Sequence, residues 1–256
     1  MHVDLGCGLH KHDHFWGIDR IDAPGVDCVC DINDGIPLPD NTVEFVMISR
    51  SLPYVTDLFA VMADVYRICY HKAIVCILAP YAHHFRHMSN PNLKHKFDEY
   101  TPRYFTKSFA QPSGCTFCPP VPDYLVNDVP FDFRLVRMEL FYEPPYSTSL
   151  YEQDELDMLQ YVQPNLVSEI MYHFVVVKKE LPPDEWQQLC KQTYMEPIWA
   201  PALRRQLEPV EIVEASEIVD SPLPAPLPAP LPPKEPSKPA KKAPSQAKKK
   251  SRAKKS

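Results

Sequence analysis

Glycine is scarce in this chain, and its distribution is uneven. Only six of the 256 residues are glycine, and five of them lie at or before Gly35. Glycine serves where the backbone takes a positive φ angle or must approach another group closely. We therefore expect one place of close backbone approach, formed by the first 35 residues.

Long hydrophobic runs are also missing. No apolar stretch reaches the roughly 18 residues that a membrane-spanning helix needs, and no charged leader with an apolar segment precedes the first predicted strand. These absences argue against a membrane protein and favour a cytoplasmic location. We expect the eight cysteines to be reduced thiols there.

Basic residues are few outside the end of the chain. Residues 221–256 carry ten Lys or Arg and one acid, with ten of the thirty prolines, whereas the preceding part has a net charge of −15. The acidic body argues against a broad nucleic-acid groove. We expect the tail to be disordered. It would either bind nucleic acid or another anionic partner, or merely keep the protein soluble.

The most informative residues stand near the start. Val3-Asp4-Leu5-Gly6-Cys7-Gly8 has the pattern of a buried strand followed by a glycine turn, and Gly17-Ile18-Asp19 that of a second strand ending in a carboxylate. Such a pair indicates a nucleotide or cofactor pocket at the carboxyl edge of a parallel sheet. Gly8 and Asp19 are eleven residues apart, too few for a full crossover helix, which argues against a nicotinamide-dinucleotide site.

The remaining pattern predicts an α/β fold with a doubly wound, mostly parallel sheet and an antiparallel edge. We expect one domain over residues 1–180, a partly helical or irregular extension over 181–220, and the tail over 221–256. The predicted helix covers residues 56–70. The predicted strands cover residues 2–5, 15–18, 26–30, 43–49, 73–78, 131–142 and 167–177.

Asp4-Leu5-Gly6-Cys7-Gly8 resembles motif I of the class I S-adenosylmethionine-dependent methyltransferases. The resemblance continues through Asp31-Ile32, the strand at residues 43–48 and the helix and strand at residues 61–80, and it covers about residues 1–179. The stretch at residues 90–109 is similar to the type 11 group of that family. The resemblance implies a Rossmann-like, seven-stranded sheet and S-adenosylmethionine as the cofactor.

The resemblance also implies cofactor-binding residues. Asp19 has the carboxylate that can accept hydrogen bonds from both ribose hydroxyls, and Asp22 is a weaker candidate for that role. The remaining implied residues are the turn at Asp4, Gly6, Cys7 and Gly8, the following Lys11, the adenine-side Asp31 and Ile32, and Ser49 at the end of a strand.

The sequence indicates the catalytic residues and the methyl acceptor less closely than the cofactor site. A methyltransferase often needs only a base for the acceptor's proton, and His83, His84, His87 and His95 follow the strand at residues 73–78. The acceptor would be a small molecule, a sugar or a nucleobase, held by the irregular segment 81–130.

Two features of the sequence qualify this picture. Leu52-Pro53-Tyr54-Val55 replaces a Glu-His pair that is common in the family. The alternative is therefore a degenerate fold that binds cofactor or a partner without turnover. Cys115 and Cys118 form a single Cys-x-x-Cys motif without a second such motif in the sequence, so we expect no metal site.

Overall fold

The computed structural model describes residues 1–126 and 128–204. The tail at residues 221–256, with its predicted anionic partner, lies outside these residues, as does the second part of the 181–220 extension. No helix among the described residues is long and apolar enough to cross a membrane.

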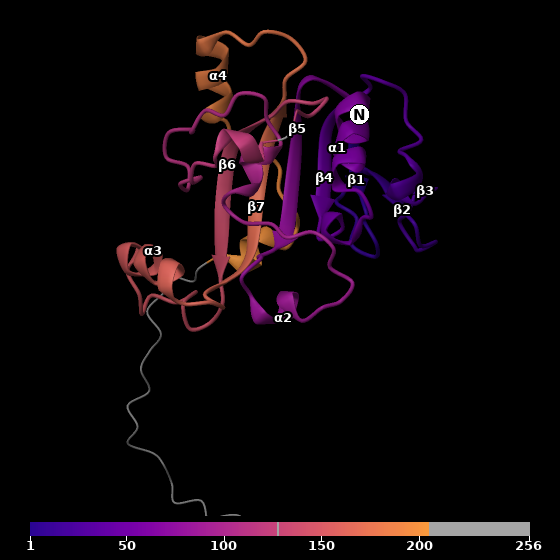
Figure 1. Cartoon of the computed structure of the whole chain (residues 1–256). Helices are drawn as coiled ribbons and strands as arrows, with labels where there is room; N and C mark the ends of the chain where they lie inside the picture. Colours follow the sequence, from indigo (N-terminus) through magenta and orange to yellow (C-terminus); the bar gives the residue numbers. More distant parts are fainter. Residues whose placement is uncertain (127, 205–256) are drawn as a thin grey trace, which may run out of the picture. The chain divides into compact units, whose positions relative to one another are not determined.

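A seven-stranded sheet forms the centre of the protein (Figure 1). Its order is β3-β2-β1-β4-β5-β7-β6; the first five strands are parallel, and β7 is antiparallel to both of its neighbours. The predicted fold class, a mostly parallel Rossmann-like sheet with an antiparallel edge, is confirmed. The strands are β1 (His2–Leu5), β2 (Trp16–Asp19), β3 (Cys28–Val29), β4 (Val43–Ser49), β5 (Cys69–Pro80), β6 (Phe133–Tyr142) and β7 (Val167–Val176).

Five α-helices and four short 3₁₀ helices accompany the sheet among the described residues. The α-helices are α1 (Leu58–Ile68), α2 (Phe85–Met88), α3 (Gln153–Val162), α4 (Pro183–Cys190) and α5 (Ala200–Leu203). Short 3₁₀ helices are η1 (Ile32–Asp34), η2 (Leu52–Tyr54), η3 (Thr101–Tyr104) and η4 (Asp123–Leu125). Between β1 and β2 the chain forms turns and no helix, as the short spacing predicted.

Helix α1 begins where Asp57 accepts a hydrogen bond from the Ala60 amide, and it ends earlier than predicted. The prediction continued the helix to residue 70, whereas Cys69 already belongs to β5. Cys69 is fully buried and pairs with Val43 of β4. Because strand pairing and burial of Cys69 outweigh the helical periodicity, the chain passes from helix to strand without a loop.

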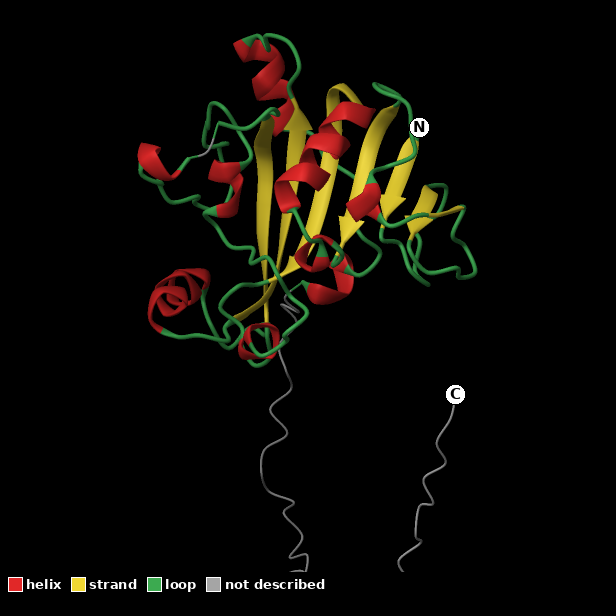
Figure 2. Cartoon of the chain, turned by 45° about the vertical axis from the view of Figure 1, so that its right-hand side comes forward, coloured by secondary structure: helices red, strands yellow, loops and turns green. Residues whose placement is uncertain are grey.

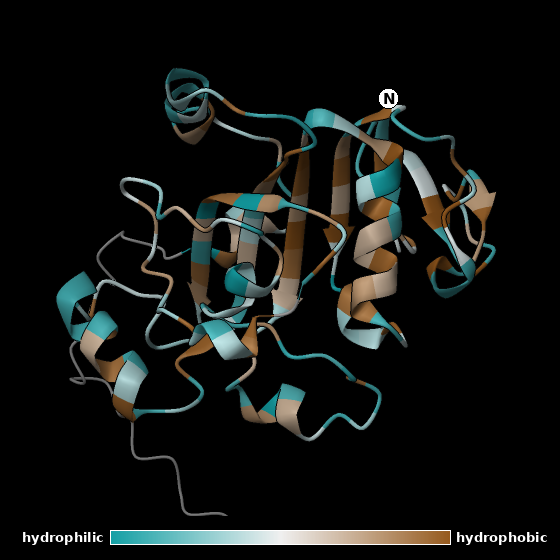
Figure 3. Cartoon of the chain, turned by 45° about the horizontal axis from the view of Figure 1, so that its top comes forward, coloured by the Kyte–Doolittle hydropathy of each residue, from teal (hydrophilic) through white to brown (hydrophobic). Residues whose placement is uncertain are grey.

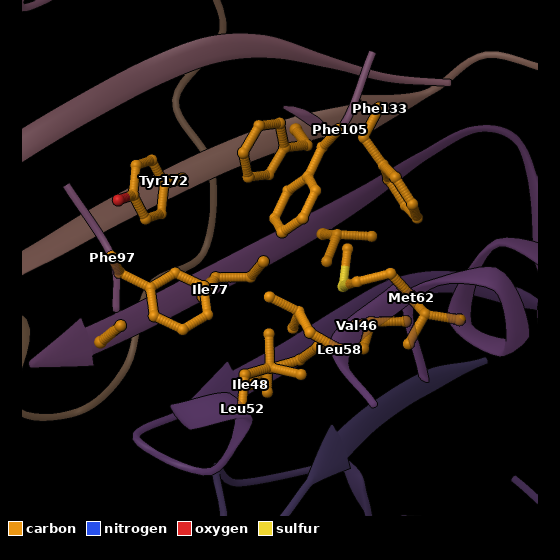
Figure 4. Close-up of a cluster of buried hydrophobic side chains, with 14 of the residues drawn as sticks. Val46, Ile48, Leu52, Leu58, Met62, Ile77, Phe97, Phe105, Phe133 and Tyr172 are labelled. Carbon is orange, nitrogen blue, oxygen red and sulfur yellow. The ribbon is translucent and has the colours of Figure 1, made fainter. Parts of the chain in front are cut away.

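Apolar side chains cover both faces of the sheet. On one face α1 lies across the strands (Figure 2). There Leu58 and Met62 approach Ile48 and Ile77, beside the aromatic ring of Phe105 from the loop after β5 (Figure 4).

The other face is covered by residues 181–204. Trp186, Leu189 and Ala200 pack there against Met47 and the neighbouring apolar side chains of the sheet. The strands are correspondingly hydrophobic along most of their length, while α3 alternates hydrophobic and hydrophilic residues (Figure 3). The segment after β7 therefore completes the core instead of merely following it.

Candidate functional site

The glycine turn after β1 packs closely against the segment that follows β4. Gly6 has a φ angle of 71°, and its amide donates to the Ile18 carbonyl at 2.7 Å. A β-carbon added to Gly6 would lie 2.3 Å from the β-carbon of Ser51. Ser51 itself donates to the Leu5 carbonyl at 3.0 Å. Glycine is thus required here both for the backbone angle and for space.

Asp19 lies at the carboxyl end of β2, where it connects two loops. Its carboxylate accepts the Gly8 amide at 2.8 Å through one oxygen and the Ile21 amide at 2.9 Å through the other. A carboxylate oxygen can accept a further hydrogen bond, so each oxygen keeps capacity for a ligand. The two amide bonds fix the carboxylate's orientation beside the glycine turn.

A cavity of about 220 Å³ opens beside Asp19. Asp31 and Ile32 line it, together with Tyr54. The Asp31 carboxylate accepts the Asn33 amide at 2.9 Å, and this bond helps to hold the pKa of Asp31 below its usual range. The cavity therefore combines two carboxylates and the cationic Arg20 with an apolar and an aromatic wall.

A second cavity, of about 200 Å³, adjoins the other side of the glycine turn; Gly6 lines both. Asp4, Cys7, Gly8 and Ser49 contribute to its wall. With Gly6, five residues of the predicted cofactor set thus meet in one cavity at the carboxyl ends of β1 and β4.

Asp4 is the most unusual group in that cavity. The residue is 3% exposed; one carboxylate oxygen accepts the His12 amide at 2.9 Å, and the other is buried without a hydrogen-bond partner. Burial raises the pKa of Asp4 to about 6. An unpaired buried carboxylate oxygen is costly, and a cationic ligand group in this cavity would compensate for it.

The sequence interpretation missed part of the cavity wall. Pro197, Ile198 and Trp199 close it from the segment after β7, and the Trp199 ring lies edge-on to His10 at 4.9 Å. Nothing in a local pattern signals that residues almost 200 positions from the glycine turn complete its cavity.

Arg50 also lines this cavity. Its φ angle is 59°, and its guanidinium holds the Glu169 carboxylate of β7 through two hydrogen bonds of 2.5 and 2.8 Å. This bidentate pair fixes the end of β4 against β7.

Lys11 has a different position from the other predicted residues. Its ammonium forms a 2.7 Å ion pair with Asp27, which also accepts the Gly17 amide at 2.7 Å. Lys11 lines neither of the two cavities. In this structure it stabilises the connection between β2 and β3.

The four histidines predicted as bases each contact a different partner. His95 and His87 bond through Nε2 to the carbonyls of Val55 and Ser168, each at 3.0 Å. His84 is buried beside Glu143, and burial lowers its pKa. His83 is exposed, 3.9 Å from Asp98, and lines a third, larger cavity. In residues 1–126 and 128–204 no three His, Cys, Asp or Glu side chains are grouped to hold a metal.

That third cavity measures about 780 Å³ and lies where β5 and β6 end and β7 begins. Tyr81 and Glu99 stand in its wall, both buried, and the Tyr81 hydroxyl lies 3.0 and 2.9 Å from the two Glu99 oxygens. The sequence interpretation did not single out this pair, because only the tertiary structure buries it.

Comparison with known proteins gives structural likeness alone. No protein-family model and no curated protein matches this chain. Solved structures that are similar include S-adenosylmethionine-dependent methyltransferases from Thermotoga maritima, Aquifex aeolicus and Mesorhizobium loti. Their identities are 12%, 12% and 13% and their TM-scores 0.43, 0.38 and 0.35. They cover 68%, 69% and 68% of this chain and 80%, 81% and 90% of their own.

Proposed function

We propose that this protein binds S-adenosylmethionine across the glycine turn and is a methyltransferase. The observation that carries the proposal is the unpaired, buried oxygen of Asp4 in a cavity that meets a second, carboxylate-lined cavity at Gly6. One side calls for a cation, and the other offers acceptors for hydroxyl and amine donors.

The residues present fit the cofactor's chemical groups. Asp4 suits the α-ammonium of the methionine part, because an ammonium donates to carboxylate oxygens. Asp19 retains acceptor capacity for the two ribose hydroxyls, and Asp31 with Ile32 suits the amine and the ring of adenine. Bound there, the cofactor supplies an activated methyl group on a sulfonium sulfur. The chain's part is to align the acceptor and to remove its proton.

Calorimetric titration with S-adenosylmethionine and S-adenosylhomocysteine tests the proposal. We expect the wild-type chain to bind both, and Asp19→Ala to weaken binding at least tenfold. Asp22→Ala is the control: this exposed carboxylate, the weaker candidate from the sequence, lines neither cavity. Equal loss in both variants, or no binding by the wild type, would contradict the assignment of the cofactor site.

Binding of the cofactor does not by itself show that the protein transfers a methyl group. The replacement of the Glu-His pair by Leu52-Pro53-Tyr54-Val55 favours the alternative of a protein that holds cofactor or a partner without methyl transfer. His87 and His95 also favour this alternative, because their Nε2 atoms already bond to backbone carbonyls. Formation of S-adenosylhomocysteine with any acceptor would remove this alternative.

A further inference from the structure

The cavity of about 780 Å³ beside Tyr81 and Glu99 has an unusual charge character. Its charged or titratable lining groups are the carboxyl groups of Glu99 and Asp157, the imidazole of His83, the thiol of Cys115 and tyrosine hydroxyls. None of the described lining residues is Lys or Arg. A cavity of this size is large enough for a small organic molecule, and its charges favour a cationic one.

Glu99 is the group on which the cavity's preference for a cationic ligand depends. It is 8% exposed, and its carboxyl accepts a hydrogen bond from the Tyr81 hydroxyl and one from its own backbone amide. Within the described part of the chain no Lys, Arg or His side chain forms an ion pair with it. Burial raises the pKa of this carboxyl. Buried carboxylates are normally paired, so the cavity lacks the cation that Glu99 would be expected to have.

The rest of the wall suits an ammonium with an apolar body. Aromatic rings attract a cation over their faces and also pack against apolar groups. The aromatic lining residues are Tyr81, Tyr100, Phe117, Tyr142 and Tyr161. An anion would instead meet two carboxylates, and a neutral molecule would leave Glu99 without a cationic partner.

We infer that this cavity binds a small protonated amine with an aromatic or alkyl body, and that Glu99 is the counter-ion of its ammonium. The cavity adjoins the carboxyl end of β5, at the same edge of the sheet as the candidate cofactor site. If the proposed methyl transfer operates, this amine would be its acceptor, a consequence that rests on the proposed function. Glu99 would first take one proton from the ammonium; the nitrogen lone pair would then bond to the methyl carbon as the bond from that carbon to the sulfonium sulfur breaks, with S-adenosylhomocysteine as the leaving group.

Titration of the full chain with phenethylamine, phenethyl alcohol and phenylacetate tests the charge preference. We expect phenethylamine to bind the wild type at least tenfold more tightly than the other two. Glu99→Gln keeps the shape and an acceptor for Tyr81, so it should lose that preference while retaining its fold. Asp184→Asn, an exposed carboxylate on α4, is the control and should behave as the wild type.

The outcomes separate this inference from the proposed function. No binding of phenethylamine, equal binding of the alcohol, or an unchanged preference in Glu99→Gln would overturn the amine site even if S-adenosylhomocysteine binds. A Glu99-dependent amine preference without cofactor binding would support the amine site and contradict the methyltransferase. Appearance of N-methylphenethylamine with S-adenosylmethionine would support both.

Discussion

At the scale of single residues, Asp4 combines a stability cost with a candidate binding role. Its folded-state pKa of about 6 lies above the ordinary value of 3.8. The folded chain therefore binds a proton more tightly than the unfolded chain does, and this residue's contribution makes the protein more stable as the pH falls from above 6 toward 4. Above pH 6 the buried charge lowers the free energy of unfolding.

Replacement of Asp4 by Asn should consequently stabilise the protein at pH 7.5, by about 1–3 kcal/mol at 1.4 kcal/mol per pKa unit. The gain should vanish near pH 4, where the wild-type carboxyl is also protonated. Urea unfolding at both pH values measures this, with Asp22→Asn as the exposed control. Loss of stability at pH 7.5 would instead indicate that the carboxylate is structural.

Asp4 also predicts how cofactor binding depends on pH. A bound ammonium needs the ionised carboxylate, so affinity for S-adenosylmethionine should fall by up to about tenfold per pH unit below 6. Calorimetry between pH 5 and 8 measures the dependence. Asp4→Asn should bind weakly at every pH in that range, and a wild-type affinity that stays constant would argue against the contact.

Gly6 gives a second prediction at this scale, because it faces Ser51 so closely. Gly6→Ala should cost about 2–4 kcal/mol, from overpacking and from a positive φ angle together. Gly114→Ala is the control: it has the same φ of 71° but nothing within 4 Å of the added carbon, so it should cost only about 1 kcal/mol. Adding Ser51→Gly to Gly6→Ala should restore part of the loss; no restoration would mean that the contact with Ser51 is not the cause.

At the scale of elements, Arg67 connects α1 to the loop that follows η1. Its guanidinium donates to the carbonyls of Ile36 and Leu38 and forms ion pairs with Asp40 and Asp64. The planar guanidinium can make these bonds at once, whereas a lysine ammonium cannot reproduce their geometry. The loop held in this way begins directly after the residues that line the Asp31 cavity.

We therefore expect Arg67→Lys to lower the free energy of unfolding by about 1–2 kcal/mol, somewhat less than fully buried charged hydrogen bonds are worth because the side chain is 35% exposed. Arg86→Lys should change it by less than about 0.5 kcal/mol, since Arg86 makes one exposed ion pair with Glu143. Chemical denaturation of both variants decides the matter, and equal effects would refute the special role of Arg67.

At the scale of the whole molecule, residues 181–204 join the second face of the sheet to the candidate cofactor cavity. Ala200 of α5 is fully buried against that face, while Trp199 next to it closes the cavity. The Arg204 guanidinium donates two hydrogen bonds to the Glu139 carboxylate of β6. The same segment therefore covers this face of the sheet and completes the cavity wall.

Ala200→Glu should disrupt both, because it would bury an unpaired charge; we expect a loss of at least about 3 kcal/mol and weaker cofactor binding. Ala202→Glu, two residues further on α5 but exposed, should leave both unchanged. Thermal unfolding with and without S-adenosylhomocysteine measures the two effects. An unaffected cavity in a destabilised Ala200→Glu would show that the segment does not form the wall.

The sequence by itself determined the features that depend on neighbouring residues. Alternation and apolar runs located β1 and β4 with their observed bounds and the other main strands approximately. The short distance from Gly8 to Asp19 argued against a full first crossover helix. It also located the turn at Gly6 and the carboxylate of Asp19, since both follow directly from strand ends. The end of α1 was wrong because burial of Cys69 in a strand is not visible in a helical periodicity.

Only the tertiary structure decided what depends on distant residues. Ser51 meets Gly6, Trp199 closes the cavity of Asp4, and Tyr81 and Glu99 become a buried pair because the strand order brings these segments together. The raised pKa of Asp4 likewise follows from desolvation, which a sequence does not display. Local patterns fix the ends of strands, whereas cavities and charges depend on which chain segments surround them.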